Sequence, residues 1–321
     1  MDICSPCTAV TSPAVNEMPV HRWSLRRRIF QTSFFIVFIF APVLDVFRLD
    51  LNLGHFIFFG YSWTLGLDPL LAGQASPLEA IFNITVRGFL PLFGIILTFV
   101  WVSWKYGRLY CGWLCPHFSV VEMVNGLMRR ASGKFSLWDR NKLSSRRPDG
   151  QRLQINHHYW WLVFMAVLGF AFLWAVVFLT YLLPPKEIYP NLIHLTLTRN
   201  QMLFIGVATF LLSIEFLFAR HLFCRFACAV GVFQSLVWMA NKQAMVVSFE
   251  RQRGTDCQGC HHACEDECPM RLKPRSIKRH MFNCTECARC IDACEEVQGN
   301  KGKPTLLRWQ DGQSALEESN R

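Results

Sequence analysis

Cysteine is concentrated in one stretch of the sequence, between residues 257 and 294, which holds eight of the chain's 14 cysteines. They form two compact sets: Cys257, Cys260, Cys264 and Cys268, and then Cys284, Cys287, Cys290 and Cys294. Thiolates are soft ligands that suit iron–sulfur clusters, and close spacing lets several sulfurs converge on one cluster with little loop to order. The two sets therefore indicate one-electron chemistry.

The spacing predicts the cluster type and the ligand sets. A bacterial ferredoxin run reads Cys-x2-Cys-x2-Cys-x3-Cys-Pro, and its fourth cysteine binds the cluster of the other run. The second set has this cysteine spacing, whereas the first has one extra residue before Cys264 but keeps the proline, Pro269. We therefore expect two [4Fe–4S] clusters with crossed ligation, one held by Cys257, Cys260, Cys264 and Cys294, the other by Cys284, Cys287, Cys290 and Cys268.

Two alternatives stay open for these cysteines. Structural zinc also uses paired Cys-x2-Cys, although its two pairs usually stand well apart, whereas each set here supplies four cysteines within about a dozen residues. The inserted residue in the first set falls at His261-His262, so a histidine could replace one cysteine as a ligand.

The composition, 52% hydrophobic and only 17% charged, indicates a membrane protein. We expect an α-helical protein with four transmembrane helices, at 29–44 (extended by Val46 and Phe47), 88–104, 159–183 and 202–218. The net charge of +10 lies beside these runs, where it sets topology, and this argues against a nucleic-acid partner. Basic segments before the first run and after the second and fourth predict that both termini and the clusters are cytoplasmic.

Each expected pair of spans ends in a similar motif. Cys111-x3-Cys115-Pro116 follows the second span, and Cys224-x3-Cys228 follows the fourth. This repeat predicts two parallel helical hairpins about an axis along the membrane normal, which would bring the four thiols together. They could bind Cu(I), hold a further metal centre or relay electrons, or they could simply be small residues suited to helix packing.

These features divide the chain into six segments. We expect a flexible tail (1–20), the first hairpin with its motif (21–130), a basic cytoplasmic loop (131–158), the second hairpin with its motif (159–245), an α+β ferredoxin-like domain with both clusters (246–309) and a C-terminal tail (310–321). Cys4-x2-Cys7 in the first tail could bind a soft metal or cycle as a dithiol. Glu215, inside the fourth span, is either functional or paired with Arg220.

Residues 21–309 resemble the membrane-bound polyferredoxin family, which includes the NapH, MauN and FixG/CcoG proteins. The resemblance rests on Cys111-Gly-Trp-Leu-Cys115-Pro, on the second motif running into 231–235, and on the second ferredoxin run, and it is strongest to the FixG/CcoG branch. The chain departs from that branch at Ala229, where proline is expected, at the extra residue of the first run, and in showing no C-terminal immunoglobulin-like domain.

The resemblance implies a bacterial inner-membrane iron–sulfur protein that transfers electrons. It makes Cys111, Cys115, Cys224 and Cys228 the candidate catalytic residues, with copper or a quinone as a further ligand. The partner would be a redox protein or the quinone pool. Two classes of function follow: a redox enzyme that oxidises quinol or reduces Cu(II), or a maturation factor for a respiratory or periplasmic redox enzyme with little turnover of its own.

Overall fold

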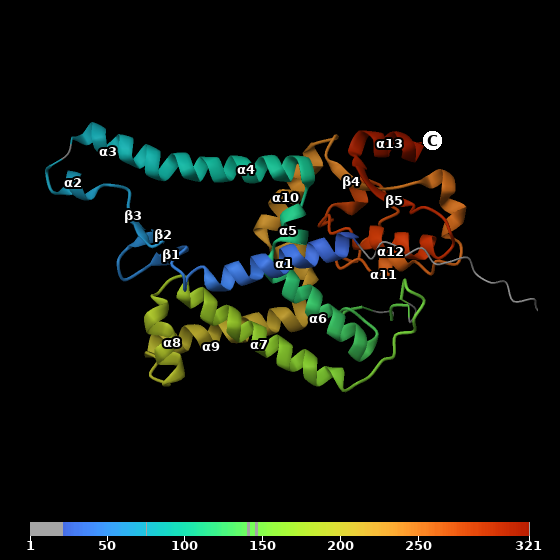
Figure 1. The fold of residues 1–321 in the computed structure, drawn as a ribbon, viewed down its shortest axis with the longest axis horizontal. Helices are drawn as coiled ribbons and strands as arrows, with labels where there is room; N and C mark the ends of the chain where they lie inside the picture. Colours follow the sequence, from blue (N-terminus) through green and yellow to red (C-terminus); the bar gives the residue numbers. More distant parts are fainter. Residues whose placement is uncertain (1–21, 75, 140–141, 145–146, 321) are drawn as a thin grey trace, which may run out of the picture.

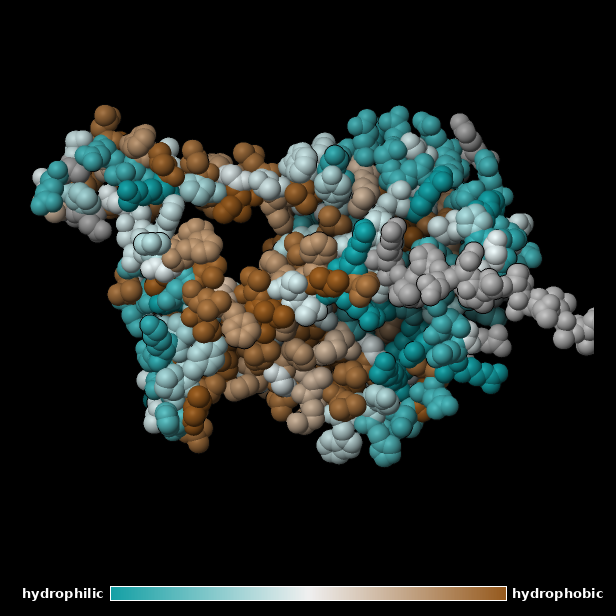
Figure 2. Space-filling view, in the orientation of Figure 1, coloured by the Kyte–Doolittle hydropathy of each residue, from teal (hydrophilic) through white to brown (hydrophobic). Residues whose placement is uncertain are grey.

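The computed structural model describes residues 22–74, 76–139, 142–144 and 147–320, so the tail motif Cys4-x2-Cys7 lies outside the described residues. The chain is mostly helical; α7 (Tyr159–Thr180) and α9 (Arg199–Ile214) pack against each other, whereas the long helix α3–α4 (Pro77–Tyr106) extends apart from them (Figure 1). A hydrophobic band crosses the middle of the molecule between two hydrophilic ends (Figure 2). The cysteine-rich C-terminal part lies at one end of the long helices, as a membrane protein with an attached polar domain requires.

Three helical segments in the described part of the chain are long and apolar enough to cross a membrane. The first, Pro77–Tyr106, combines α3 (Pro77–Ile84), a π-helix (Thr85–Phe89) and α4 (Leu90–Tyr106). The second is α7 (Tyr159–Thr180), and the third, Arg199–Ala219, is α9 (Arg199–Ile214) with the π-helix η2 (Glu215–Ala219). These three segments coincide with the second, third and fourth expected spans. They support the prediction that this chain is a membrane protein.

The remaining expected span is shorter than predicted. Helix α1 covers Arg22–Phe40, and the chain then turns and enters a strand at Phe47, so the predicted continuation of the helix to Phe47 is wrong. The apolar part of α1 begins at Ile29 and would extend about 18 Å, against roughly 30 Å of hydrocarbon. A fourth complete span therefore stays a prediction.

The segment after α1 forms a small antiparallel sheet of β1 (Phe47–Asp50), β2 (His55–Phe58) and β3 (Tyr61–Trp63), in that order. Arg48 of β1 is buried and pairs with Asp45 and Asp50, which stabilises the turn into the sheet. The sheet and α8 (Pro185–Ile193) lie at the end of the molecule opposite the C-terminal part (Figure 1).

The helix that follows each motif packs against the other predicted hairpin segment, where the first segment is residues 21–130 and the second is residues 159–245. Within the first segment, α1 and α4 (Leu90–Tyr106) do not pack extensively on each other, so a first packed hairpin stays a prediction. Helix α6 (Pro116–Ser132) follows the first motif but packs against α7 of the second hairpin. Helix α10 (Ala229–Ala240) follows the second motif but packs against α4 of the first. The buried core forms mainly on α6 and α7, around Val121, Val124 and Val167. This packing places each motif against residues of the other hairpin segment.

The C-terminal part has an α+β fold. Strand β4 (Met245–Phe249) pairs antiparallel with β5 (Leu307–Asp311), with Val247 opposite Trp309. Between them lie α11 (Ala263–Asp266) and α12 (Arg289–Gly299). Residues 310–320 do not form the predicted tail, because β5 extends to Asp311 and α13 (Gly312–Asn320) then packs against β4.

Candidate functional site

The eight clustered cysteines line two separate small cavities, four in each. The cavities also differ in their other walls, since Phe249 and Leu307 line the first and Met270 and Leu272 the second. The cysteines of the first cavity are Cys257, Cys260, Cys264 and Cys294, and those of the second are Cys284, Cys287, Cys290 and Cys268. The last cysteine of each run thus lines the cavity of the other run, which is the grouping that crossed ligation requires.

The arrangement of the sulfurs suits a cluster better than a single ion. Zinc requires four ligands at about 2.0–2.3 Å from one point. Among the described residues, no three His, Cys, Asp or Glu side chains converge tightly enough to hold one metal ion. Four thiols that line the wall of one cavity instead match the donor set of a [4Fe–4S] cluster.

The two histidines of the inserted segment do not replace a cysteine in this arrangement. Neither His261 nor His262 lines the first cavity. Both have a positive φ, and the side chain of His262 is 64% exposed, with its Nδ1 2.6 Å from Nη2 of Arg275. The extra residue is therefore accommodated as a turn between Cys260 and Cys264.

Burial favours the protonated form of four of these thiols when no metal is bound. Burial raises the pKa of Cys268 to about 11 and that of Cys264 to about 12, and it raises the pKa of Cys284 and Cys290 well above the ordinary value. Since cluster ligands are thiolates, loading either cavity must release protons.

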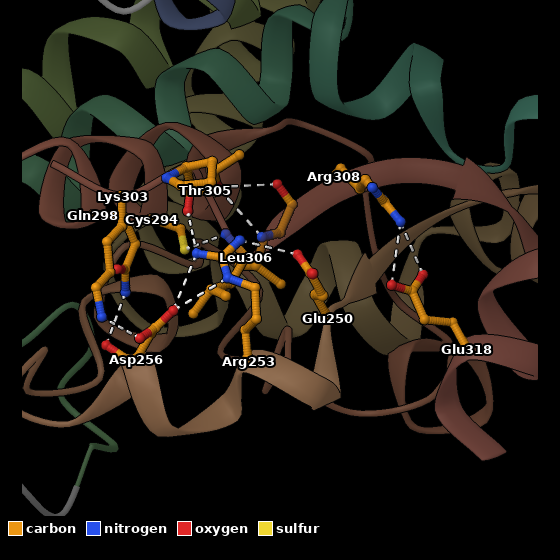
Figure 3. Close-up of polar contacts among 12 residues, drawn as sticks. Glu250, Arg253, Asp256, Cys294, Gln298, Lys303, Thr305, Leu306, Arg308 and Glu318 are labelled. Carbon is orange, nitrogen blue, oxygen red and sulfur yellow. Dashed lines mark hydrogen bonds and ion pairs between the residues drawn. The ribbon is translucent and has the colours of Figure 1, made fainter. Parts of the chain in front are cut away.

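Both crossing cysteines accept a backbone N–H. Leu306 N donates to Cys294 Sγ at 3.4 Å, and Leu272 N donates to Cys268 Sγ at 3.4 Å. Figure 3 shows Cys294 beside the polar contacts that fix the first cavity, in which Gln298 Nε2 donates to the carbonyl of Asp256 at 3.0 Å. Hydrogen bonds to the sulfurs are one of the factors that set the reduction potential of a cluster.

The structure also brings the two membrane-edge motifs together. Cys111 lies in α5 (Leu109–Trp113) and donates to Oε1 of Gln234 in α10 at 3.1 Å. Cys224 lies in the π-helix η3 (Phe223–Ala227), and its Sγ is 3.8 Å from Nδ1 of His117 in α6. Each motif's first cysteine therefore contacts the helix that follows the other motif.

The four membrane-edge thiols share a buried environment. Cys115 and Cys228 are the N-cap residues of α6 and α10, while Cys111 and Cys224 are both 7% exposed. Burial raises the pKa of Cys115 to about 12 and that of Cys111 and Cys224 above the ordinary value. Burial therefore favours the protonated form of these three thiols, which would lose protons on binding a soft metal ion.

Two buried arginines hold the motifs in place. Arg108 of the first motif donates through Nη2 to the carbonyl of Cys224 at 2.6 Å. A Cβ on Gly231 would lie 2.2 Å from that nitrogen, so only glycine fits there. Arg220 of the second hairpin, which is completely buried, reaches Sδ of Met128 in α6. Each of the two arginines therefore contacts the other predicted hairpin segment.

His117 is a candidate that the sequence reasoning missed. Its Nε2 lies 2.9 Å from Oε2 of Glu215, so Glu215 is hydrogen-bonded to His117 rather than paired with Arg220. The signal was present in the sequence, since His117 directly follows Cys115-Pro116. An imidazole beside the Cys224 sulfur adds a nitrogen ligand to the set of thiols.

The first motif packs directly on the ligand loop of the second cavity. A Cβ on Gly112 would lie 2.2 Å from the carbonyl oxygen of Thr285 and 3.3 Å from Cα of Cys287. The neighbouring Trp113 donates through Nε1 to the carbonyl of Glu286 at 3.0 Å. The membrane-edge thiols and the second cluster cavity are therefore joined by close backbone contact.

A buried ion-pair network fastens the same boundary. Glu122 of α6 accepts from Nη2 of Arg27 in α1 at 2.8 Å and lies 3.4 Å from Nη1 of Arg289 in α12. Arg289 also pairs with Glu267, and Glu267 pairs with Arg129 of α6. Burial alone would raise the pKa of Glu122, but Arg27 and Arg289 hold it below the ordinary value. The charges fix the iron–sulfur part against the helices.

Two histidines in the loops between the predicted spans, His55 and His194, lie away from the cysteines. His55 begins β2 and His194 follows α8, and both elements are at the opposite end of the molecule (Figure 1). The structure does not bring them to either cluster cavity or to the motifs.

A family of 4Fe-4S binding domains matches this chain twice, over residues 88–134 and 200–243. Each match contains one Cys-x3-Cys motif, and neither reaches the eight cysteines after residue 256. The double match agrees with the internal repeat and covers each motif together with the span before it.

Several curated proteins are similar along most of the chain. The ferredoxin-type protein NapH of Escherichia coli is 23% identical over 86% of this chain and 88% of its own length. The methylamine utilization ferredoxin-type protein MauN of Methylorubrum extorquens is 26% identical over 77% of this chain and 76% of its own. The nitrogen fixation protein FixG of Rhizobium meliloti is 26% identical over 71% of this chain and 44% of its own. No solved structure matches the chain.

Proposed function

We propose that this chain moves electrons between its two cluster cavities and a redox partner at the membrane-edge thiols. The chain belongs to the membrane-bound ferredoxin-type proteins and is an iron–sulfur electron-transfer protein. The observation that supports the proposal most is the contact of Gly112 with the carbonyl of Thr285. It puts the motif that contains Cys111 and Cys115 against the loop that contains Cys284 and Cys287.

When bound, [4Fe–4S] clusters supply one-electron oxidation and reduction. We assign one cluster to Cys257, Cys260, Cys264 and Cys294 and the other to Cys284, Cys287, Cys290 and Cys268. The protein positions these ligands and donates backbone N–H groups to Cys268 and Cys294. Basic segments next to membrane spans stay on the cytoplasmic side, so this domain would lie in the cytoplasm. The membrane would be the bacterial inner membrane.

The membrane-edge site favours a soft metal ion as the substrate. Sulfur and imidazole are preferred ligands of Cu(I). One such pair, Cys224 Sγ and His117 Nδ1, is 3.8 Å apart. The described side chains form no preformed three-ligand site, so a bound ion would have to draw Cys111, Cys115 or Cys228 toward it. Cu(II) that receives one electron at this site would leave as Cu(I), for delivery to a partner protein. Oxidation of quinol is the competing reaction, with the protons released to the aqueous side.

An assay on anaerobically purified protein separates these functions. Iron and sulfide analysis should give about eight iron atoms per chain, and EPR should show two interacting clusters. Reduced protein mixed with Cu(II) should produce Cu(I), and the Cys111→Ser/Cys224→Ser variant should lose this activity but keep its iron. Quinol that reduces the oxidised protein would support the alternative reaction. Absence of reaction with either would favour a maturation factor and remove the enzyme proposal.

A further inference from the structure

A cavity of about 670 Å³ lies between helices α1 and α6 and the iron–sulfur part of the chain. Its walls come from α1, α6, α12 and residues 147–153, with Glu267 and Pro269 on either side of Cys268. Six arginines line it: Arg27, Arg28, Arg129, Arg130, Arg147 and Arg289. The electron-transfer proposal makes no use of this space.

The buried arginines of the cavity have unused hydrogen-bond donors. Arg27 and Arg129 are 5% and 7% exposed. Within the described residues, Nε and Nη1 of Arg27 and Nε and Nη2 of Arg129 have no hydrogen-bond partner, and the same holds for both polar atoms of the Asn125 side chain. Buried donors of a charged group are costly when unpaired, so these nitrogens require an acceptor.

Within the described part of the chain, no acidic residue of the lining accepts a hydrogen bond from these nitrogens. Glu122 and Glu267 are already shared among three arginines. The other carboxylates are Asp149, Asp292 and Glu296, so five carboxylates face six arginines. The balance favours an anionic ligand, and arginine pairs with phosphate through two parallel hydrogen bonds.

The position of the cavity indicates where the anion comes from. On α1, the lining residue Arg28 is followed at once by Ile29 and Phe30, which are 56% and 53% exposed, as lipid-facing residues would be. The guanidinium of Arg130 lies 5.8 Å from the ring of Tyr159, the first residue of a membrane span. The cavity therefore stands at the boundary between lipid and water.

The walls also contain an apolar strip. Met123, Gly126 and Leu127 of α6 line the cavity beside the arginines. A ligand with a phosphate and an attached apolar part matches both surfaces, whereas a free inorganic anion would leave the strip uncovered. Basic side chains at a membrane surface also attract acidic lipids.

We propose that this cavity binds the phosphate-bearing head group of an anionic phospholipid. The phosphate would accept hydrogen bonds from the arginines that lack partners, and the glycerol and the start of the acyl chains would cover Met123 and Leu127. A lipid held between α1, α6 and α12 would fasten the iron–sulfur part to the membrane. This inference does not depend on which redox partner the protein has.

Lipid binding to the purified, delipidated full-length protein tests the proposal. Native mass spectrometry would follow titration with short-chain phosphatidylglycerol, with phosphatidylcholine of the same chains, and with inorganic phosphate. We expect phosphatidylglycerol to bind about tenfold more tightly than phosphatidylcholine and phosphate to bind weakly. Equal binding of the two lipids would overturn the proposal. Phosphate that binds as tightly as phosphatidylglycerol would also overturn it, because the site would then be a soluble-anion site.

Matched variants locate the binding. Arg28→Gln/Arg147→Gln removes two lining charges and should weaken phosphatidylglycerol binding about tenfold or more. Arg26→Gln/Arg152→Gln removes two neighbouring charges that do not line the cavity, and it should bind like the wild type. Equal losses in the two double variants would refute the cavity as the site. Unchanged cluster absorption in both variants checks that they fold.

Discussion

Replacing Gly112 with alanine should disturb the boundary between the membrane-edge motif and the second cluster cavity. The added Cβ would lie 2.2 Å from the carbonyl oxygen of Thr285, about 0.8 Å closer than such atoms approach in proteins. The contact is with backbone, so a side-chain rotation cannot relieve it. Overpacking of this size typically costs about 1–3 kcal/mol.

The strain would fall on a loop with cluster ligands at both sides, Cys284 and Cys287. We therefore expect a melting temperature several degrees lower, altered EPR features from the second cluster, and slower electron exchange at the membrane edge. Gly94→Ala, in α4, is the matched control, because its Cβ would have nothing within 4 Å. Wild-type stability and an unchanged EPR spectrum in Gly112→Ala would refute the close contact on which the electron-transfer proposal rests.

Three further perturbations test other parts of the structure. Cys268→Ser should alter the cluster of the second ferredoxin run and spare that of its own run, as judged by EPR and iron content; loss of the first cluster alone would contradict crossed ligation. Glu122→Gln removes the carboxylate partner of the buried Arg27 and one of the two partners of the half-buried Arg289, and it should lower the stability by about 3–5 kcal/mol. Glu317→Gln on exposed α13 should not, in parallel thermal unfolding. Burial lowers the pKa of His221 to about 4, so the folded chain keeps this side chain neutral while the unfolded chain protonates it below about pH 6.5. Stability should therefore fall by up to about 1.4 kcal/mol per pH unit from pH 6.5 toward 4, and His221→Gln should flatten that dependence in melting curves.

The sequence alone determined the features that depend on local spacing. Cysteines two or three residues apart can only lie on one turn or loop, so the two ligand runs and the paired motifs were evident before the fold was known. Three membrane spans were predictable for a similar reason, since length and hydropathy are properties of a continuous segment. The end of α1 at Phe40 was not predictable from hydropathy, because residues 41–46 are mainly apolar but form a turn that leads into β1.

Only the tertiary structure decided which distant residues meet. The packing of α6 and α10, each against the other hairpin segment, pairs Cys224 with His117 and directs Arg108 to the carbonyl of Cys224, across more than a hundred residues. Such contacts cannot be predicted from the hydrophobic periodicity of the sequence. Periodicity describes one helix at a time, and each side chain is compatible with its own helix whether or not the distant partner is present. The contact of Gly112 with Thr285 is of the same kind. The sequence shows the glycine, but the requirement for it comes from the backbone of Thr285, which only folding brings close to it.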